Sequence, residues 1–126
     1  AGEALGRPRS GDTYLIQELG IVYFDYDSSE LDATDQAILR RNAEWMRQRP
    51  DMPILIEGHC DERGTDEYNY SLGERRAVAT LNYLRSLGVT NELAVRSYGE
   101  SRPVCTEHNE DCWQLNRRAQ FMGYLE

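Results

Sequence analysis

The chain has 126 residues, enough for one domain with one core, and 40% of them are hydrophobic, which predicts a packed globule and not a disordered segment. Its formal net charge of −8 argues against a general nucleic-acid binder and against a polybasic membrane patch, because both need a basic face. No apolar run approaches the roughly 20 residues that a membrane-spanning helix requires.

The N-terminal segment and the first predicted strand differ in composition. Glycine, proline and small polar residues are frequent in residues 1–13, and we expect residues 1–20 to form a flexible lead-in to a single domain over residues 21–126. Residues 21–24 are β-branched and aromatic, which predicts a short strand. Residues 25–30 follow as a polar turn.

Residues 32–49 have the apolar periodicity of a helix with one buried face. Leu39, Ala43 and Met46 fall on one stripe of that helix. Asp32 can cap its first turn, and Pro50 ends it because the residue before a proline disfavours the α region.

Three more strands and a second helix are predicted further along the chain. The strands are expected over residues 53–58, 93–98 and 119–124, and the second helix ends near Leu87, with Gly88 as its C-terminal cap. Asp66 can cap this helix early, whereas Ser71 and Glu74 fit the spacing of a capping box, and both starts remain open.

The order of these elements predicts the architecture. Two helices can cover only one face of a small sheet, so we expect an α/β two-layer sandwich of order β-α-β-α-β-β. Its mixed sheet would have about four strands, with both helices on the same face.

The three cysteines are Cys60, Cys105 and Cys112. Cys105 and Cys112 lie in a polar segment that is predicted to be a loop. In an oxidising compartment they would form a disulfide, and in the cytosol they would remain free thiols. Cys60, next to a strand, is expected to be a buried small hydrophobe.

The densest polar stretch, residues 58–77, leaves a buried strand and enters a helix, which is where ligands bind in open α/β sheets. Two of its segments, Gly-His-Cys-Asp-Glu-Arg-Gly-Thr over 58–65 and Leu-Gly-Glu-Arg-Arg-Ala over 72–77, resemble the signature of the OmpA-like peptidoglycan-binding family. Within that family, these two segments are most similar to the peptidoglycan-associated lipoprotein branch. Further similar motifs follow in order at residues 23–27, 68–69, 97–100 and 116–119.

The resemblance implies non-covalent binding of peptidoglycan stem peptides through meso-diaminopimelate. In the family an aspartate and an arginine hold this residue, and here they correspond to Asp61 and Arg76. Their chemistry fits independently, because a centre that carries an ammonium and a carboxylate needs one acceptor and one rigid donor fork.

Further lining residues are also assigned by the resemblance. Phe24 is expected to form an apolar wall, Asn69 and Leu72 to line the pocket, and Asp25 is a weaker candidate from the same turn. Arg117 and Arg118 are expected to stabilise the fold. The loop over 104–115 is expected to crosslink the chain locally and to lie away from the site.

Other kinds of site fit the sequence less well. His59, Cys60 and Asp61, like the segment around His108, lack the C-x-x-C spacing typical of zinc sites, and we expect neither a metal nor a cofactor. A catalytic Cys–His pair must face each other in space, whereas His59 and Cys60 are adjacent in sequence. We therefore expect a binding protein and not an enzyme.

The resemblance also implies partners and a location. It places the protein on the periplasmic face of the outer membrane, with peptidoglycan as its ligand and any membrane anchor outside the chain. An alternative is a periplasmic adaptor of the Tol-Pal type, whose main partner is a TolB-like protein and for which peptidoglycan is secondary.

Overall fold

A computed structural model describes residues 13–124. Its centre is a mixed sheet in the order β1-β5-β3-β4, formed by β1 (Thr13–Leu15), β3 (Ile54–His59), β4 (Leu93–Gly99) and β5 (Arg118–Tyr124). A fifth strand, β2 (Val22–Tyr23), pairs with the start of β5. The strands β3 and β4 are parallel, and β5 is antiparallel to β3 and to β1.

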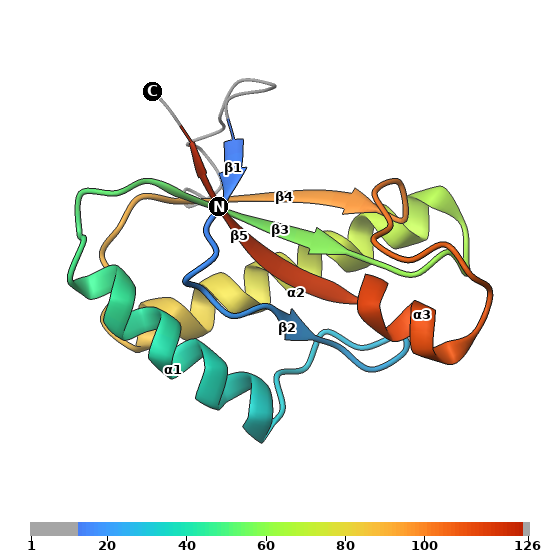
Figure 1. The fold of residues 1–126 in the computed structure, drawn as a ribbon, viewed down its shortest axis with the longest axis horizontal. Helices are drawn as coiled ribbons and strands as arrows, with labels where there is room; N and C mark the ends of the chain where they lie inside the picture. Colours follow the sequence, from blue (N-terminus) through green and yellow to red (C-terminus); the bar gives the residue numbers. More distant parts are fainter. Residues whose placement is uncertain (1–12, 125–126) are drawn as a thin grey trace.

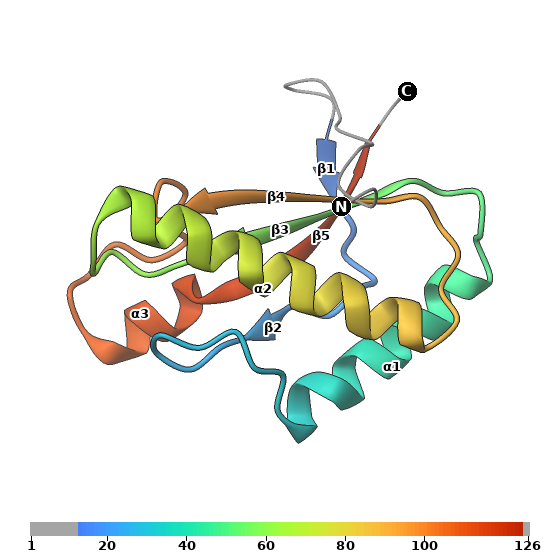
Figure 2. The same cartoon turned by 180° about the vertical axis from the view of Figure 1, so that it is seen from behind.

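The helices α1 (Ala33–Arg47) and α2 (Asp66–Ser86) lie on the same side of the sheet (Figures 1 and 2). The main core lies between them and the sheet, and it includes the predicted stripe Leu39, Ala43 and Met46. The opposite face of the sheet carries a smaller cluster around Leu55 and Ala94. The predicted two-layer α/β sandwich with helices on one face is confirmed.

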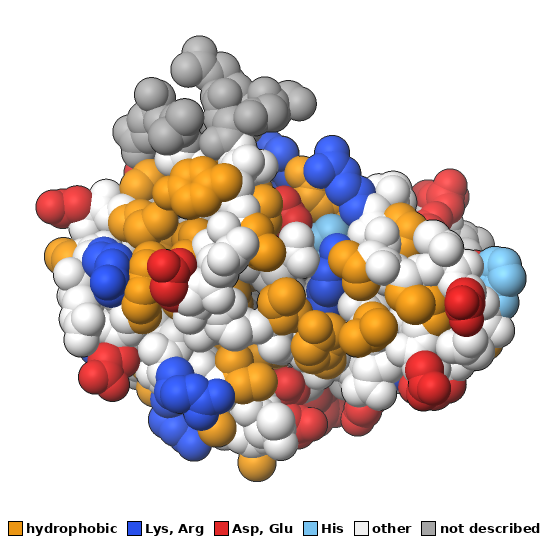
Figure 3. Space-filling view, in the orientation of Figure 1, with side chains coloured by type: hydrophobic (Ala, Val, Ile, Leu, Met, Phe, Trp, Pro, Cys, Tyr) orange, Lys and Arg blue, Asp and Glu red, His pale blue; other side chains and the backbone are white. Residues whose placement is uncertain are grey.

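Figure 3 views the face of the sheet that α1 and α2 leave uncovered. Hydrophobic and charged side chains are mixed there, with the acidic ones mostly towards the edges of the view. No helix in the described part of the chain has the length and apolar character needed to cross a membrane.

The N-terminus of α1 is capped as predicted by Asp32, whose side chain accepts from the Asp35 backbone N–H at 2.9 Å. The Asp35 side chain in turn accepts from the backbone N–H of Asp32 at 3.1 Å, which completes a capping box.

The helix α2 starts near the earlier of the two predicted positions, but its N-cap is Thr65, one residue before the predicted cap Asp66. It continues through Gly73, although glycine costs a helix interior about 1 kcal/mol relative to alanine. The reason is close packing on the sheet, because a Cβ atom on Gly73 would lie 2.3 Å from Ser97 Oγ on β4 and 3.0 Å from the carbonyl oxygen of Gly58 on β3. Gly88 follows the helix with φ +86°, as expected of a C-terminal glycine.

The expected boundary at residue 21 is wrong for residues 13–20. Thr13–Leu15 pair with β5, and Ile16 and Leu19 are buried in the main core. Burial of these apolar side chains lowers the free energy of the folded state, which favours an ordered segment over a flexible one. The strand was missed in the sequence because three residues are too few for a strand pattern to be recognised. Residues 1–12, the rest of the predicted lead-in, lie outside the described residues.

The predicted loop over 104–115 is also partly wrong, because it contains the helix α3 (Glu110–Asn116). Asn109 caps this helix by accepting from the Cys112 backbone N–H at 2.9 Å. Cys105 and Cys112 form the expected disulfide, which ties the start of α3 to the preceding turn.

Candidate ligand-binding site

The candidate site is a pocket at the C-terminal end of β3. The turn after β2 and the start of β5 lie beside this end of β3. Of the predicted residues, Asp61, Arg76, Asn69 and Leu72 line it. Phe24 and Asp25 do not. Phe24 is buried beneath the Arg76 guanidinium, 5.2 Å from the ring centre, and Asp25 contributes its backbone carbonyl while its side chain is exposed.

Asn69 holds the loop that carries Asp61 in place. Its amide nitrogen donates to the backbone carbonyl of Arg63 at 2.9 Å and to the Glu100 carboxylate at 3.0 Å. Gly64 allows the turn, because its φ of +99° is a conformation that side chains disfavour. The first residues of α2 thus fix the loop through Asn69.

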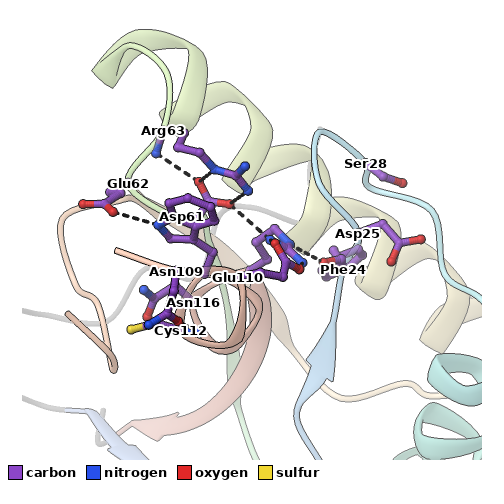
Figure 4. Close-up of polar contacts among 12 residues, drawn as sticks. Phe24, Asp25, Ser28, Asp61, Glu62, Arg63, Asn109, Glu110, Cys112 and Asn116 are labelled. Carbon is purple, nitrogen blue, oxygen red and sulfur yellow. Dashed lines mark hydrogen bonds and ion pairs between the residues drawn. The ribbon is translucent and has the colours of Figure 1, made fainter. Parts of the chain in front are cut away.

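Asp61 is only 4% exposed and accepts hydrogen bonds from two arginines. Arg63 donates from its backbone N–H, Nε and Nη2 at 3.0, 3.2 and 2.8 Å (Figure 4). Arg117 donates from Nη1 at 3.3 Å. Burial alone would raise the pKa of Asp61, but the hydrogen bonds from Arg63 and Arg117 outweigh it, so the pKa lies below its ordinary value. Asp61 is therefore an anion at neutral pH.

Arg76 is fully buried on α2, which presents its guanidinium to the pocket. It donates to three backbone carbonyls, those of Ser28 at 2.8 Å, His59 at 2.8 Å and Asp25 at 3.1 Å. Burial lowers the pKa of Arg76, yet arginine remains charged at physiological pH. Within residues 13–124 no carboxylate forms an ion pair with it.

Arg117 lines the same pocket, and the sequence interpretation of it as a purely bracing residue was incomplete. It donates to the Phe24 carbonyl at 2.7 Å and to Glu110 at 2.8 Å, besides reaching Asp61. It therefore braces β2 and α3 and also supplies charge to the site. Its position just before β5 is a sequence signal, since β5 begins beside the C-terminal end of β3, where the pocket lies.

The segment around α3 packs against the pocket residue Arg63, which corrects the expectation that it lies apart from the site. The Arg63 guanidinium lies between two aromatic rings, 4.2 Å from the centre of Tyr26 and 4.0 Å from that of Trp113. Trp113 also donates from Nε1 to Glu62 at 2.7 Å, and His108 bonds to the same carboxylate at 2.6 Å. These hydrogen bonds lower the pKa of Glu62, and Glu62 raises the pKa of His108.

Six further lining residues were not singled out from the sequence as pocket residues. They are Tyr26, Asp27, Cys60, Arg63, Gly64 and Tyr68. The Tyr68 hydroxyl donates to Asp27, which joins α2 to the turn after β2 across the mouth of the pocket. A polar turn and the first turn of a helix carry no signal in one sequence that they meet.

His59 and Cys60 are both buried and make hydrogen bonds within the fold. His59 is buried, bonds to Glu57 at 3.1 Å and stacks on Tyr98, whereas Cys60 donates to the Asn69 carbonyl. Burial lowers the pKa of His59 and raises the pKa of the Cys60 thiol to about 11, so both are neutral at pH 7. Over residues 13–124 no three acidic, histidine or cysteine side chains are arranged to hold a metal ion.

Comparison with known proteins gives consistent relatives. The model of the OmpA family matches residues 23–117. A peptidoglycan-associated lipoprotein of Brucella melitensis is 44% identical over 119 residues, which are 94% of this chain and 71% of that protein. The crystal structure of the peptidoglycan-associated lipoprotein from Burkholderia pseudomallei superposes with a TM-score of 0.78 at 41% identity, over 82% of this chain and 88% of that one.

A more distant neighbour shares the fold alone. The C-terminal domain of Helicobacter pylori MotB superposes with a TM-score of 0.76 at 20% identity, over 88% of this chain and 87% of that one.

Proposed function

Because the chain belongs to the OmpA family, we propose that it binds peptidoglycan non-covalently and associates the outer membrane with the cell wall from the periplasmic side. The family is one of structural binding proteins, and the chain is not an enzyme. More narrowly, we propose that the ligand is the meso-diaminopimelate residue of a stem peptide.

The observation that carries this proposal is the buried charge of Arg76, which has no carboxylate partner in the described residues. A buried cation without an anion is costly, and a carboxylate from a ligand removes that cost. Three of the five N–H groups of a guanidinium are accounted for by backbone carbonyls, which leaves two for a ligand.

Asp61 supplies the complementary charge in the same pocket. The free end of meso-diaminopimelate carries an ammonium and a carboxylate on one carbon, so it can engage an anion and a cation that lie side by side. Lysine ends in an ammonium alone, and it would leave Arg76 uncompensated. The pair therefore favours diaminopimelate-type over lysine-type walls.

The test is a calorimetric titration of the protein with a diaminopimelate muropeptide and with its lysine counterpart. We expect saturable binding of the diaminopimelate form, weakened at least about 30-fold by Asp61→Asn, because a buried charge pair loses one partner. Arg76→Lys keeps the charge but removes the fork, and it should weaken binding as well.

Arg75→Lys is the matched control, since Arg75 is the next residue of α2 and bonds to Ser71 outside the pocket. It should bind like the wild type, with folding of every variant checked by circular dichroism. Failure of the folded wild type to bind either muropeptide would reject the proposal.

A second candidate partner is a TolB-like periplasmic protein that docks on the rim of this pocket. The observation in its favour is the exposure of Tyr26 and Tyr68 there, because tyrosine is enriched at protein interfaces. Such a partner would compete with the muropeptide, so a saturating muropeptide should release it. Simultaneous binding of both would contradict a shared surface.

A further inference from the structure

The acceptor positions of Asp61 are already filled. Its Oδ1 accepts from the backbone N–H and Nε of Arg63, and its Oδ2 accepts from Nη2 of Arg63 and Nη1 of Arg117. A carboxylate offers about four lone-pair positions. A ligand ammonium can bind this carboxylate only if one of the present donors leaves.

The two arginines differ in how firmly they are held. The Arg117 side chain is 3% exposed and is fixed by Glu110 and the Phe24 carbonyl as well as by Asp61. The Arg63 side chain is 32% exposed, and in the described part of the chain it donates to no acceptor other than Asp61. Arg63 is therefore the donor that can leave.

The departure of the Arg63 side chain opens one position on each oxygen of Asp61, because Nε occupies Oδ1 and Nη2 occupies Oδ2. The backbone N–H of Arg63 remains on Oδ1, so the loop keeps its turn. Two adjacent acceptor positions suit an ammonium group, which has three N–H donors.

The rings of Tyr26 and Trp113 help to hold the Arg63 guanidinium in its position beside Asp61. A guanidinium on the face of an aromatic ring is attracted by the ring quadrupole, and here it has a ring on each side. Trp113 is fixed in turn by its hydrogen bond to Glu62 and by the disulfide-tied helix α3.

Resting on the proposed function, we propose that Arg63 is an intramolecular competitor for Asp61, which occupies the ammonium position in the free protein and leaves it when the ligand binds. Trp113 strengthens this competition by stacking on Arg63. Arg63 thus lowers the affinity of the site, although it lies within it and carries a charge.

The experiment compares muropeptide affinities of the full chain by calorimetry, with the diaminopimelate muropeptide as the probe. Arg63→Gln should bind about fivefold more tightly than the wild type, since it removes one partly exposed ion pair that the ligand must otherwise break. Trp113→Leu should change the affinity in the same direction by a smaller factor.

Trp45→Leu is the matched control. It removes a tryptophan that stacks on Arg49, at 4.1 Å and away from the pocket, and it should leave the affinity unchanged. Structural damage lowers affinity, so a gain in Arg63→Gln and Trp113→Leu but not in Trp45→Leu would identify competition.

The two proposals fail in different ways. Wild-type binding together with equal or weaker binding by folded Arg63→Gln would overturn the competition and leave the proposed function intact. Absence of binding by the wild type would reject the proposed function, and the competition with it.

Discussion

Asp35 keeps a carboxyl group in a buried position at the first turn of α1. Burial, as the main cause, raises its pKa from the ordinary 3.8 to about 6. The folded protein therefore holds this proton more tightly than the unfolded chain does. The contribution of this proton to the free energy of unfolding is fully present below pH 3.8 and is lost as the pH rises through about 6.

Asp35→Asn should remove this pH dependence, because the amide is neutral at every pH and its oxygen can still accept from the Asp32 backbone N–H. We expect the variant to be more stable than the wild type by about 1 kcal/mol at pH 7.5, and to lose this advantage near pH 3.5. Urea unfolding at the two pH values measures the difference. An equal difference at both would show that the charge of Asp35 is not the cause.

The position of the two central residues in the pocket could be predicted from the sequence, but the position of their neighbours could not. Asp61 and Arg76 stand out by type and motif, and both line the pocket. The contact of Trp113 with Arg63 joins residues 50 positions apart through a tertiary packing that no local pattern encodes. The expectation for Phe24 was only approximate, since it supports Arg76 from below.

At the scale of single elements, α3 depends on the disulfide more than a longer helix would. It has seven residues, and isolated helices shorter than about 12 residues are marginal in water. Asn109 caps it and the Cys105–Cys112 bond holds its first turn, so two local features replace the missing length.

Replacing both cysteines of this bond by serine should lower the free energy of unfolding by ~2 kcal/mol, from the chain entropy of a seven-residue separation. Urea unfolding measures it. A reducing agent should bring the wild type to the level of the double variant and leave the variant unchanged. A wild type that is indifferent to reduction would contradict a stabilising role of the bond.

The long elements could be predicted and the short ones could not, for a physical reason. The helix α1 repeats its buried positions from Asp35 to Met46, and β3 opens with three consecutive apolar residues, 54–56, so each pattern is long enough to be recognised. The strand β1 and the helix α3 span three and seven residues, and both owe their structure to partners distant in sequence or to a crosslink.

At the scale of the whole molecule, the segment between β1 and β2 closes one end of the core. Ile16 is 3% exposed, and its backbone N–H donates to the Phe121 carbonyl at 3.0 Å, whereas the preceding Leu15 is 45% exposed. Ile16→Ala should lower the free energy of unfolding by about 2–4 kcal/mol, and Leu15→Ala by less than about 0.5 kcal/mol.

Thermal or urea unfolding of the two variants measures this contrast directly. Equal, small losses would mean that residues 13–20 contribute little to the core and that the domain begins where the sequence first suggested, at residue 21.

The sheet register gives the molecule a defined response to tension. Thr13 pairs with Tyr124 at one end of β5, whereas Ala119, at the other end, pairs with Gly58 beside the pocket. A force that pulls Thr13 outward while a ligand holds the pocket acts on β1 and β5 along their length and in opposite directions. The β1–β5 hydrogen bonds are then sheared together and not peeled apart in sequence. A short antiparallel pair loaded in this way resists more force than its length alone would suggest.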